Sequence, residues 1–197
     1  MQAPQFKGLK VSISEKRIAR TVQKLAGQID RYARANRISE LSVVCVLDGA
    51  FMFCADLVRA IKTPTRIVFL KARSYDGTRR GALSLARIPE TLQDRSVLVV
   101  DTVYDTGKTI AKVLREIRKR TSQTSKIALA VLVEKQGKAA APPGLLPGPV
   151  QRPLQGSPAI KTFVGIRVPG DPFLVGYGLD AGGRFRHWKD IRIYSES

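Results

Sequence analysis

Apolar residues recur along this chain in two patterns, one typical of amphipathic helices and one typical of buried strands. Steps of three or four residues predict a helix after the N-cap Ser14, with an apolar side formed by Ile18, Val22, Leu25, Ile29 and Tyr32. The same spacing predicts helices over residues 49–62 and 109–120. Continuous apolar runs predict buried strands at residues 41–47 and 97–100, and further strands are expected at residues 65–71 and 127–133.

The order of these elements predicts the fold class. Strands that alternate with helices indicate an α/β fold, with a mostly parallel twisted sheet covered by helices on both faces. Shorter strands, expected at residues 161–168, 173–179 and 191–194, would form a small accessory (hood) lobe from the chain ends. The length of 197 residues suits one domain over residues 1–197.

Two segments lack a hydrophobic period. Residues 71–88 are polar and contain Gly, which predicts a mobile loop or a hairpin. Residues 137–158 are rich in Pro and Gly, which predicts an exposed, flexible insertion. No apolar run approaches the roughly 20 residues that cross a bilayer, so no membrane span is expected.

The segment after the 97–100 strand carries the clearest chemical signal. Asp101 follows the strand, and a Thr/Gly-rich turn from Asp105 leads into the next predicted helix. Backbone N–H groups and the helix dipole converge at such a turn and bind phosphate. A P-loop would need Gly where Thr102 stands, so a nucleotide-triphosphatase motif is excluded. A plain strand-turn-helix with Asp105 as helix cap is the alternative.

This segment resembles the phosphoribosyl-pyrophosphate (PRPP) loop of the type I phosphoribosyltransferases. Residues 46–57, 132–135 and 163–186 extend the resemblance to the hypoxanthine-guanine phosphoribosyltransferase branch, through strings such as Val175-Gly176-Tyr177-Gly178-Leu179-Asp180. The matching stretches are spread over most of the chain in the family's order. The resemblance implies the type I phosphoribosyltransferase fold and transfer of 5-phosphoribosyl from PRPP to a 6-oxopurine.

The resemblance also implies where PRPP binds. The ribose hydroxyls are expected at Asp101 and Thr102, the latter in place of the family's second acid. The 5′-phosphate is expected at Asp105, Thr106, Gly107, Lys108 and Thr109. The pyrophosphate is expected at Leu47, Asp48, Gly49 and Arg186, with Asp48 where the family commonly has Lys. In the family the peptide bond at the position of Leu47–Asp48 is often cis.

The base and the catalytic groups follow in the same way. By resemblance, Lys135 binds the purine 6-oxo group, Phe173 stacks on the ring, and the backbone of Leu174 meets its edge. Asp105 is the expected general base at N7, and Asp180 the expected ligand of a Mg²⁺ cofactor. Ser74 and Tyr75 resemble the start of a lid loop.

Each of these roles has a structural alternative. Phe173 suits a core position, and Lys135 could form a surface ion pair with Glu134. Asp180 could simply begin a turn, and Arg186 could belong to a generally basic surface.

Charge is the unusual feature of the composition. The chain has 34 Lys and Arg against 16 Asp and Glu, a net charge of +18. Such a field attracts polyanions, whether phosphorylated small molecules or RNA, without discriminating among them. Adaptation to an unusual cellular milieu explains it equally well. Cys45 and Cys54 lie in apolar segments and are expected as buried free thiols, which suits the cytoplasm.

The leading functional hypothesis is therefore a purine salvage enzyme that forms IMP or GMP and pyrophosphate from PRPP and hypoxanthine or guanine. Family members are usually homodimers or homotetramers. One alternative is a catalytically weakened regulator of the same fold that binds nucleotide or RNA. Another is an enzyme with a different base preference, such as xanthine.

Overall fold

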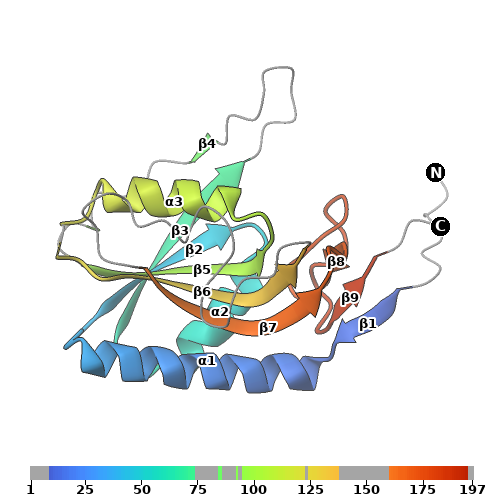
Figure 1. Cartoon of the computed structure of the whole chain (residues 1–197). Helices are drawn as coiled ribbons and strands as arrows, with labels where there is room; N and C mark the ends of the chain where they lie inside the picture. Colours follow the sequence, from blue (N-terminus) through green and yellow to red (C-terminus); the bar gives the residue numbers. More distant parts are fainter. Residues whose placement is uncertain are drawn as a thin grey trace.

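A twisted sheet with helices on both faces forms the body of the protein in the computed structural model (Figure 1). The structure describes residues 9–73, 84–85, 92, 95–122, 124–137 and 160–194. Its helices are α1 (Glu15–Ala35), α2 (Phe51–Ala60) and α3 (Lys108–Arg118). Its strands are β1 (Lys10–Ile13), β2 (Leu41–Leu47), β3 (Thr65–Arg73), β4 (Ser84–Leu85), β5 (Ser96–Tyr104), β6 (Ile127–Gln136), β7 (Lys161–Pro169), β8 (Leu174–Val175) and β9 (Ile191–Ile193).

The main sheet has the strand order β4-β3-β2-β5-β6-β7. Strands β3, β2, β5, β6 and β7 are parallel, and β4 pairs antiparallel with β3. Helix α3 covers one face, and α1 and α2 cover the other (Figure 1). This arrangement confirms the predicted fold class. It forms because the central strands are apolar enough to be buried under helices on both sides.

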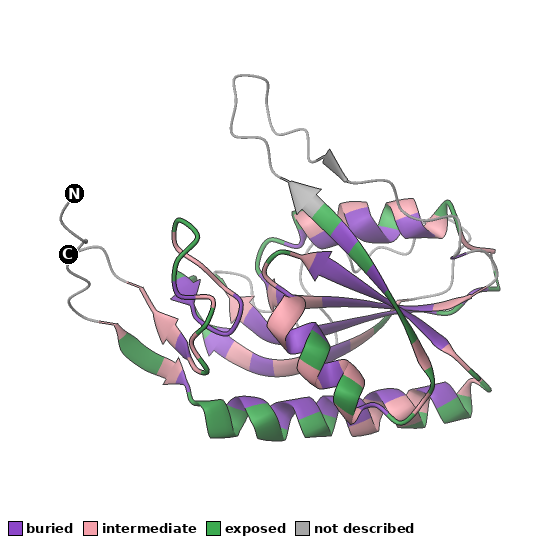
Figure 2. Cartoon of the chain, turned by 180° about the vertical axis from the view of Figure 1, so that it is seen from behind, coloured by how far each residue is buried: buried purple, intermediate pink, exposed green. Residues whose placement is uncertain are grey.

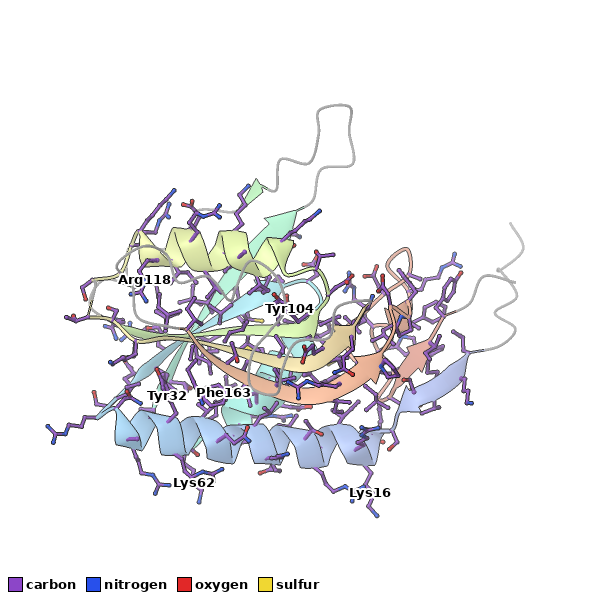
Figure 3. The ribbon with its side chains drawn as sticks, viewed as in Figure 1. Lys16, Tyr32, Lys62, Tyr104, Arg118 and Phe163 are labelled. Atoms are coloured by element: carbon purple, nitrogen blue, oxygen red, sulfur yellow. The ribbon has the colours of Figure 1, made fainter. Side chains whose placement is uncertain are left out.

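Helix α1 forms where the apolar period predicts it. The Ser14 side chain accepts a hydrogen bond from the Arg17 N–H, and the Asn36 side chain donates to the Tyr32 carbonyl at the other end. The buried side of the helix faces the sheet, and its exposed side faces away (Figure 2). Tyr32 lies between α1 and the sheet, where its ring meets the edge of Phe163 at 5.7 Å (Figure 3).

Asp30 ties α1 to the connection between α2 and β3. Its carboxylate accepts hydrogen bonds from the backbone N–H groups of Lys62 and Thr63 and from the Thr63 hydroxyl. Partial burial alone would raise the pKa of Asp30, but these hydrogen bonds and the charge of Arg34 leave that pKa below its ordinary value. The ionised carboxylate therefore stabilises the folded state.

Several helices and strands begin or end at residues other than those predicted. Strand β2 matches its prediction at residues 41–47, whereas α2 begins only at Phe51, so Gly49 is in a turn. Strand β5 was predicted to end at residue 100 but continues to Tyr104. Asp101 and Tyr104 pair with residues of β6, and this pairing keeps the polar residues in the strand.

Two predictions for the second half of the chain are wrong. Residues 161–168 were expected in the accessory lobe, but β7 is the outermost strand of the main sheet, paired along β6 and covered by α1. Residues 173–179 were expected as one strand, but β8 ends at Val175. Gly176 and Gly178 have φ values of 95° and 93° and turn the chain there.

A small antiparallel sheet, β1-β9-β8, lies beyond the carboxyl ends of the main strands (Figure 1). Strand β1 was not predicted, because its four residues are too short to show a period. Most of the predicted loop at 71–88 and of the insertion at 137–158 lies outside the described residues. Within the described part of the chain, no helix is both long and apolar enough to cross a membrane.

Gly165 is required where α1 packs on β7. A Cβ at this position would lie 2.6 Å from both the Leu132 carbonyl oxygen and Thr21 Cγ2. We expect G165A to lower the free energy of unfolding by about 1–3 kcal/mol in urea denaturation, because the backbone must shift. In the control G27A the new Cβ meets only Arg31 Nη1 at 3.6 Å. The free energy of unfolding of G27A should rise by about 0.5–1 kcal/mol, because Ala is favoured over Gly within a helix. Equal effects in both variants would contradict this packing.

Candidate active site

The predicted phosphate cradle connects β5 to α3. Asp105 and Thr106 are exposed, and Gly107 is buried as the N-cap of the helix. Gly107 has a φ of 72°, and a Cβ there would lie 2.1 Å from the Tyr104 hydroxyl. Only Gly fits, and the first N–H groups of α3, from Lys108 and Thr109 onward, have no carbonyl of their own helix to bond. The backbone at this turn can bind an anion.

Lys135 lies beside Asp105 at the carboxyl ends of neighbouring strands. Its Nζ is 3.5 Å from Asp105 Oδ2 and 2.8 Å from Asp171 Oδ1. The Lys135 side chain is 12% exposed, so its ammonium is held mainly by these two carboxylates. Sequence reasoning did not find Asp171, which follows β7 in a turn with no motif of its own.

The alternative pairing of Lys135 with Glu134 is wrong. Glu134 is fully buried on the opposite side of β6, because consecutive strand residues face opposite ways. Its Oε2 accepts from Arg167 Nε at 2.7 Å. Burial and the charge of Glu134 raise the pKa of Tyr104 to about 12, so the hydroxyl beneath the phosphate cradle stays protonated.

Phe173 is exposed rather than part of the core. Half of its surface, 51%, is open to solvent, and its ring meets Tyr194 edge-on at 5.6 Å. Leu174, the next residue, is buried in β8. The core alternative for Phe173 is therefore wrong, and a flat apolar face is open to a planar ligand.

The predicted pyrophosphate loop, Leu47 to Gly49, follows β2. The Leu47–Asp48 peptide is cis. The Asp48 carboxylate extends into solvent and lies 3.6 Å from Lys71 Nζ. The Gly49 carbonyl accepts a hydrogen bond from the Thr102 hydroxyl at 3.0 Å.

This contact corrects the prediction for Thr102. Its side chain is fully buried and its hydroxyl proton is directed to Gly49, so the structure does not present it to a ribose. Asp101 lies next to it in β5, where its Oδ1 accepts from the Thr102 N–H at 2.7 Å. Burial raises the pKa of Asp101 to about 7, against the lowering effect of the Thr102 and Val103 N–H groups.

Asp180 and Arg186 form a pair in the loop after β8. Arg186 Nη2 lies 2.8 Å from Asp180 Oδ1, and Arg186 Nη1 donates to the Gly178 carbonyl at 2.6 Å. Asp180 also accepts a hydrogen bond from the Gly183 N–H at 2.7 Å. It therefore begins a turn, as the structural alternative proposed, and also pairs with Arg186. Arg186 is oriented by two partners and is not simply one more charge on a basic surface. Among the described residues, no three His, Cys, Asp or Glu side chains gather as metal ligands.

Tyr177 anchors this loop and was not found from the sequence. Its hydroxyl donates to Asp56 Oδ2 of α2 at 2.5 Å. Burial and the charge of Asp56 raise the Tyr177 pKa well above its ordinary value. Ser74 and Tyr75, predicted at the lid, lie outside the described residues. Cys45 and Cys54 are buried and free, as predicted.

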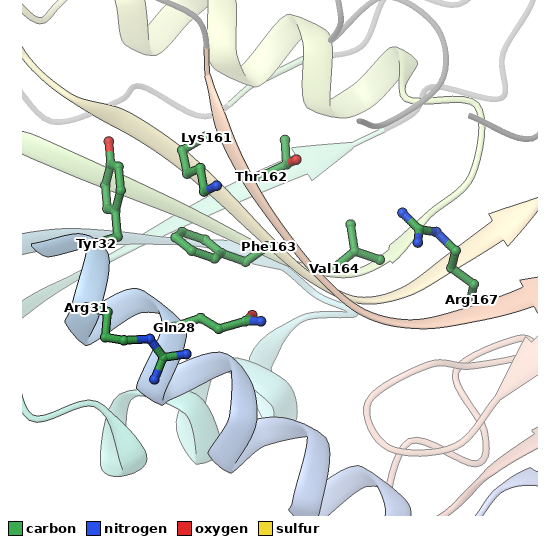
Figure 4. A pocket seen from close by; sticks show the side chains of 8 residues that line it. All are labelled: Gln28, Arg31, Tyr32, Lys161, Thr162, Phe163, Val164 and Arg167. Carbon is green, nitrogen blue, oxygen red and sulfur yellow. The ribbon is translucent and has the colours of Figure 1, made fainter. Parts of the chain in front are cut away.

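A separate cavity of about 500 Å³ lies at the outer edge of β7, against α1 (Figure 4). Basic side chains of both elements line it, among them Arg31, Lys161 and Arg167. None of the predicted site residues takes part in it. Part of the high positive charge therefore lies away from the candidate active site.

Known proteins that resemble this chain identify its family. The family model of the phosphoribosyl transferase domain matches residues 12–143. The chain belongs to the phosphoribosyltransferase family. Hypoxanthine phosphoribosyltransferase of Salmonella typhimurium is 33% identical over 183 residues, which cover 91% of each chain. Hypoxanthine-guanine phosphoribosyltransferase of Mycobacterium avium is 31% identical over 198 residues, which cover 94% of this chain and 88% of the relative.

Solved structures of phosphoribosyltransferases share the fold. A hypoxanthine-guanine phosphoribosyltransferase from Bacillus anthracis is 26% identical, with a TM-score of 0.73 over 95% of this chain and 99% of that one. Hypoxanthine phosphoribosyltransferase from Trypanosoma cruzi, in complex with the product IMP, has a TM-score of 0.75 at 23% identity and covers 99% and 98% of the two chains. The predicted family is confirmed. These relatives are named as enzymes, so they lend no support to an RNA-binding regulator.

The pKa of Asp101 gives this phosphoribosyltransferase a testable pH dependence. Protonated Asp101 stabilises the folded state below about pH 4, and that contribution is lost as the pH rises through 7. D101N keeps an acceptor for the Thr102 N–H and has no charge to bury. We expect the free energy of unfolding of D101N, minus that of wild type, to increase by about 2–4 kcal/mol between pH 4 and pH 8 in urea denaturation.

The control, D30N, should behave in the opposite way. The pKa of Asp30 is lowered, so its contribution is present above about pH 4 and is lost below it. D30N should be less stable than wild type at pH 7, and the difference should close near pH 3. A D101N profile parallel to that of wild type would contradict the buried carboxyl group.

Proposed function

We propose that this chain transfers the 5-phosphoribosyl group of PRPP to hypoxanthine or guanine, giving IMP or GMP and pyrophosphate in purine salvage. The observation that carries the proposal is the pair formed by Lys135 and Asp105, 3.5 Å apart at the carboxyl ends of β6 and β5. A free 6-oxopurine presents two groups on one edge: O6, which accepts a hydrogen bond, and N7, which carries a proton when N9 is the attacking nitrogen. A cation and a carboxylate side by side suit that edge, with the carboxylate receiving the proton of N7.

Base recognition follows from the same groups. The Lys135 ammonium donates to O6, whereas adenine carries an amino group in that place, which cannot accept. Phe173 offers its exposed face for stacking. The backbone of Leu174, fixed in β8, meets the edge of the ring. This arrangement favours hypoxanthine and guanine, and it leaves xanthine as a base to be tested.

PRPP takes the positions around the β5–α3 turn. The N–H groups and hydroxyls of residues 105–109 hold the 5′-phosphate, with Lys108 adding charge, and Asp101 holds the ribose hydroxyls. The backbone of residues 47–49 and the guanidinium of Arg186 hold the pyrophosphate, since a planar guanidinium makes paired contacts with phosphate oxygens.

The residues fit a Mg²⁺ cofactor. Mg²⁺ usually takes one or two carboxylates together with waters and substrate phosphates. Asp180 is a partly exposed carboxylate beside Arg186, and we propose that it holds the ion with the phosphates of PRPP. When bound, Mg²⁺ neutralises charge on the departing pyrophosphate.

The chain's own residues then carry the transfer. Positive charge develops at C1′ of the ribose as the bond to pyrophosphate breaks, and N9 of the purine forms the new bond. Arg186 stabilises the leaving group, and its fixed contacts with Asp180 and Gly178 mean that little reorganisation is needed. Asp105 accepts or shares the N7 proton, while Lys135 holds O6. A homodimer or homotetramer stays a prediction from the family.

The first test is an ultraviolet assay of PRPP and Mg²⁺ with hypoxanthine, guanine, xanthine and adenine in parallel. We expect turnover with hypoxanthine or guanine and none with adenine, because of the Lys135 ammonium. Absence of turnover with every 6-oxopurine, while IMP still binds, would contradict the proposed activity and favour a nucleotide-binding regulator.

A second test separates the role of Asp105 from simple binding. D105N should lower kcat by about 100- to 10,000-fold, the usual contribution of a general base, while the Kd for IMP changes little. The control is D171N, because Asp171 also contacts Lys135 but is 66% exposed. Its kcat should fall by no more than about fivefold, as for an exposed ion pair. Equal losses of kcat and IMP affinity in D105N would show that Asp105 is not the base.

A further inference from the structure

The Gly49 carbonyl oxygen is the point where three segments of the site meet. Thr102 of β5 donates to it from one side at 3.0 Å. Gly178 packs against it from another side, so closely that a Cβ at residue 178 would lie 2.6 Å from the same oxygen. One backbone carbonyl therefore joins the pyrophosphate loop, the strand that leads to the phosphate cradle, and the loop that carries Asp180.

We propose that Thr102 is a positioning residue, whose hydroxyl fixes the pyrophosphate loop (residues 47–49) against the end of β5 and does not touch PRPP. The inference rests on the proposed function and concerns the same site. The Thr102 side chain is fully buried, and its hydroxyl needs a partner because an unsatisfied buried polar group is costly. The Gly49 carbonyl is that partner. A Thr hydroxyl can donate, whereas an ionised carboxylate at this position could only accept.

The contact reaches the groups proposed for pyrophosphate. Gly178, which packs on Gly49, accepts from Arg186 Nη1, and Arg186 in turn pairs with Asp180. The adjacent Tyr177 is bonded to Asp56 and so fixes this loop to α2. A displaced Gly49 would therefore displace the pyrophosphate-binding groups.

Lys135 does not belong to this chain of contacts. Asp105 and Asp171 hold its ammonium, and neither of them contacts Gly49 in the described hydrogen bonds. Loss of the Thr102 hydroxyl should therefore act on PRPP and pyrophosphate, and it should leave the purine unaffected. A general loss of stability, in contrast, would weaken the binding of PRPP and of the purine alike.

The test compares T102V, which keeps the shape and loses the hydroxyl, with T102S, which keeps the hydroxyl. T102V should raise KM for PRPP and the inhibition constant of pyrophosphate with Mg²⁺ by about tenfold, the effect of losing one hydrogen bond that positions the loop. Its KM for hypoxanthine should stay within about twofold of wild type, because no contact of Lys135 is lost. T102S should resemble wild type in all three constants. If T102V does not fold, T102A removes the same hydroxyl and adds no atoms.

A third variant distinguishes positioning from ribose contact. T102D introduces the acid that the family has at this place, and it should weaken PRPP binding, because the ionised carboxylate cannot donate to Gly49. Tighter PRPP binding by T102D would overturn the inference and make residue 102 a ribose ligand. Equal changes of KM for PRPP and hypoxanthine in T102V, or no change in either, would also overturn it.

The inference and the proposed function fail in different ways. A wild-type chain that turns over no purine contradicts the proposed function alone. Calorimetric binding of pyrophosphate with Mg²⁺ to wild type and T102V would still test the positioning role, because it needs no turnover. Equal affinities in that measurement would overturn the role of Thr102.

Discussion

The parallel register of β2, β5 and β6 determines where Asp101, Asp105 and Lys135 lie. Cys45 of β2 pairs with Val100 of β5, and Asp101 of β5 pairs with Val131 of β6. The three strands therefore end at the same edge of the sheet, where ligands bind in such folds. The register in turn depends on close packing under the helices on both faces, since a shift by one residue would turn every side chain of a strand to the opposite face.

Opposite charges fix the geometry of the site although the protein as a whole is strongly basic. Lys135 lies between Asp105 and Asp171, and Arg186 is paired with Asp180. Each cation is thereby directed toward one place, at the cost of part of its attraction for an anion. Part of the excess positive charge lies elsewhere, in the cavity beside β7, and adds to the field that attracts anions to the protein.

The sequence predicted the fold where burial dominates, as in the apolar run at residues 41–47. It predicted the site where a motif is contiguous, as in the turn at residues 105–109. The membership of β7 in the main sheet could not be predicted. Its sequence mixes apolar and polar residues, as a strand in a small lobe would, and only part of the strand is buried. The partner of Thr102 lies 53 residues away and follows no periodic pattern. The pair between Lys135 and Glu134, in contrast, was left open by the sequence and is excluded by the structure, where Glu134 is buried and bonded to Arg167.

The pairing of β1 with β9 has a consequence for the order of assembly. Residues 10–13 find their partner only in residues 191–193, near the other end of the described chain. As the protein is synthesised, the main sheet and the turn between β5 and α3 can form while β1 is still without a neighbour. Contacts between such distant segments close late and slowly. The small sheet that holds Leu174, beside the exposed ring of Phe173, is therefore complete only when both ends of the described chain are in place.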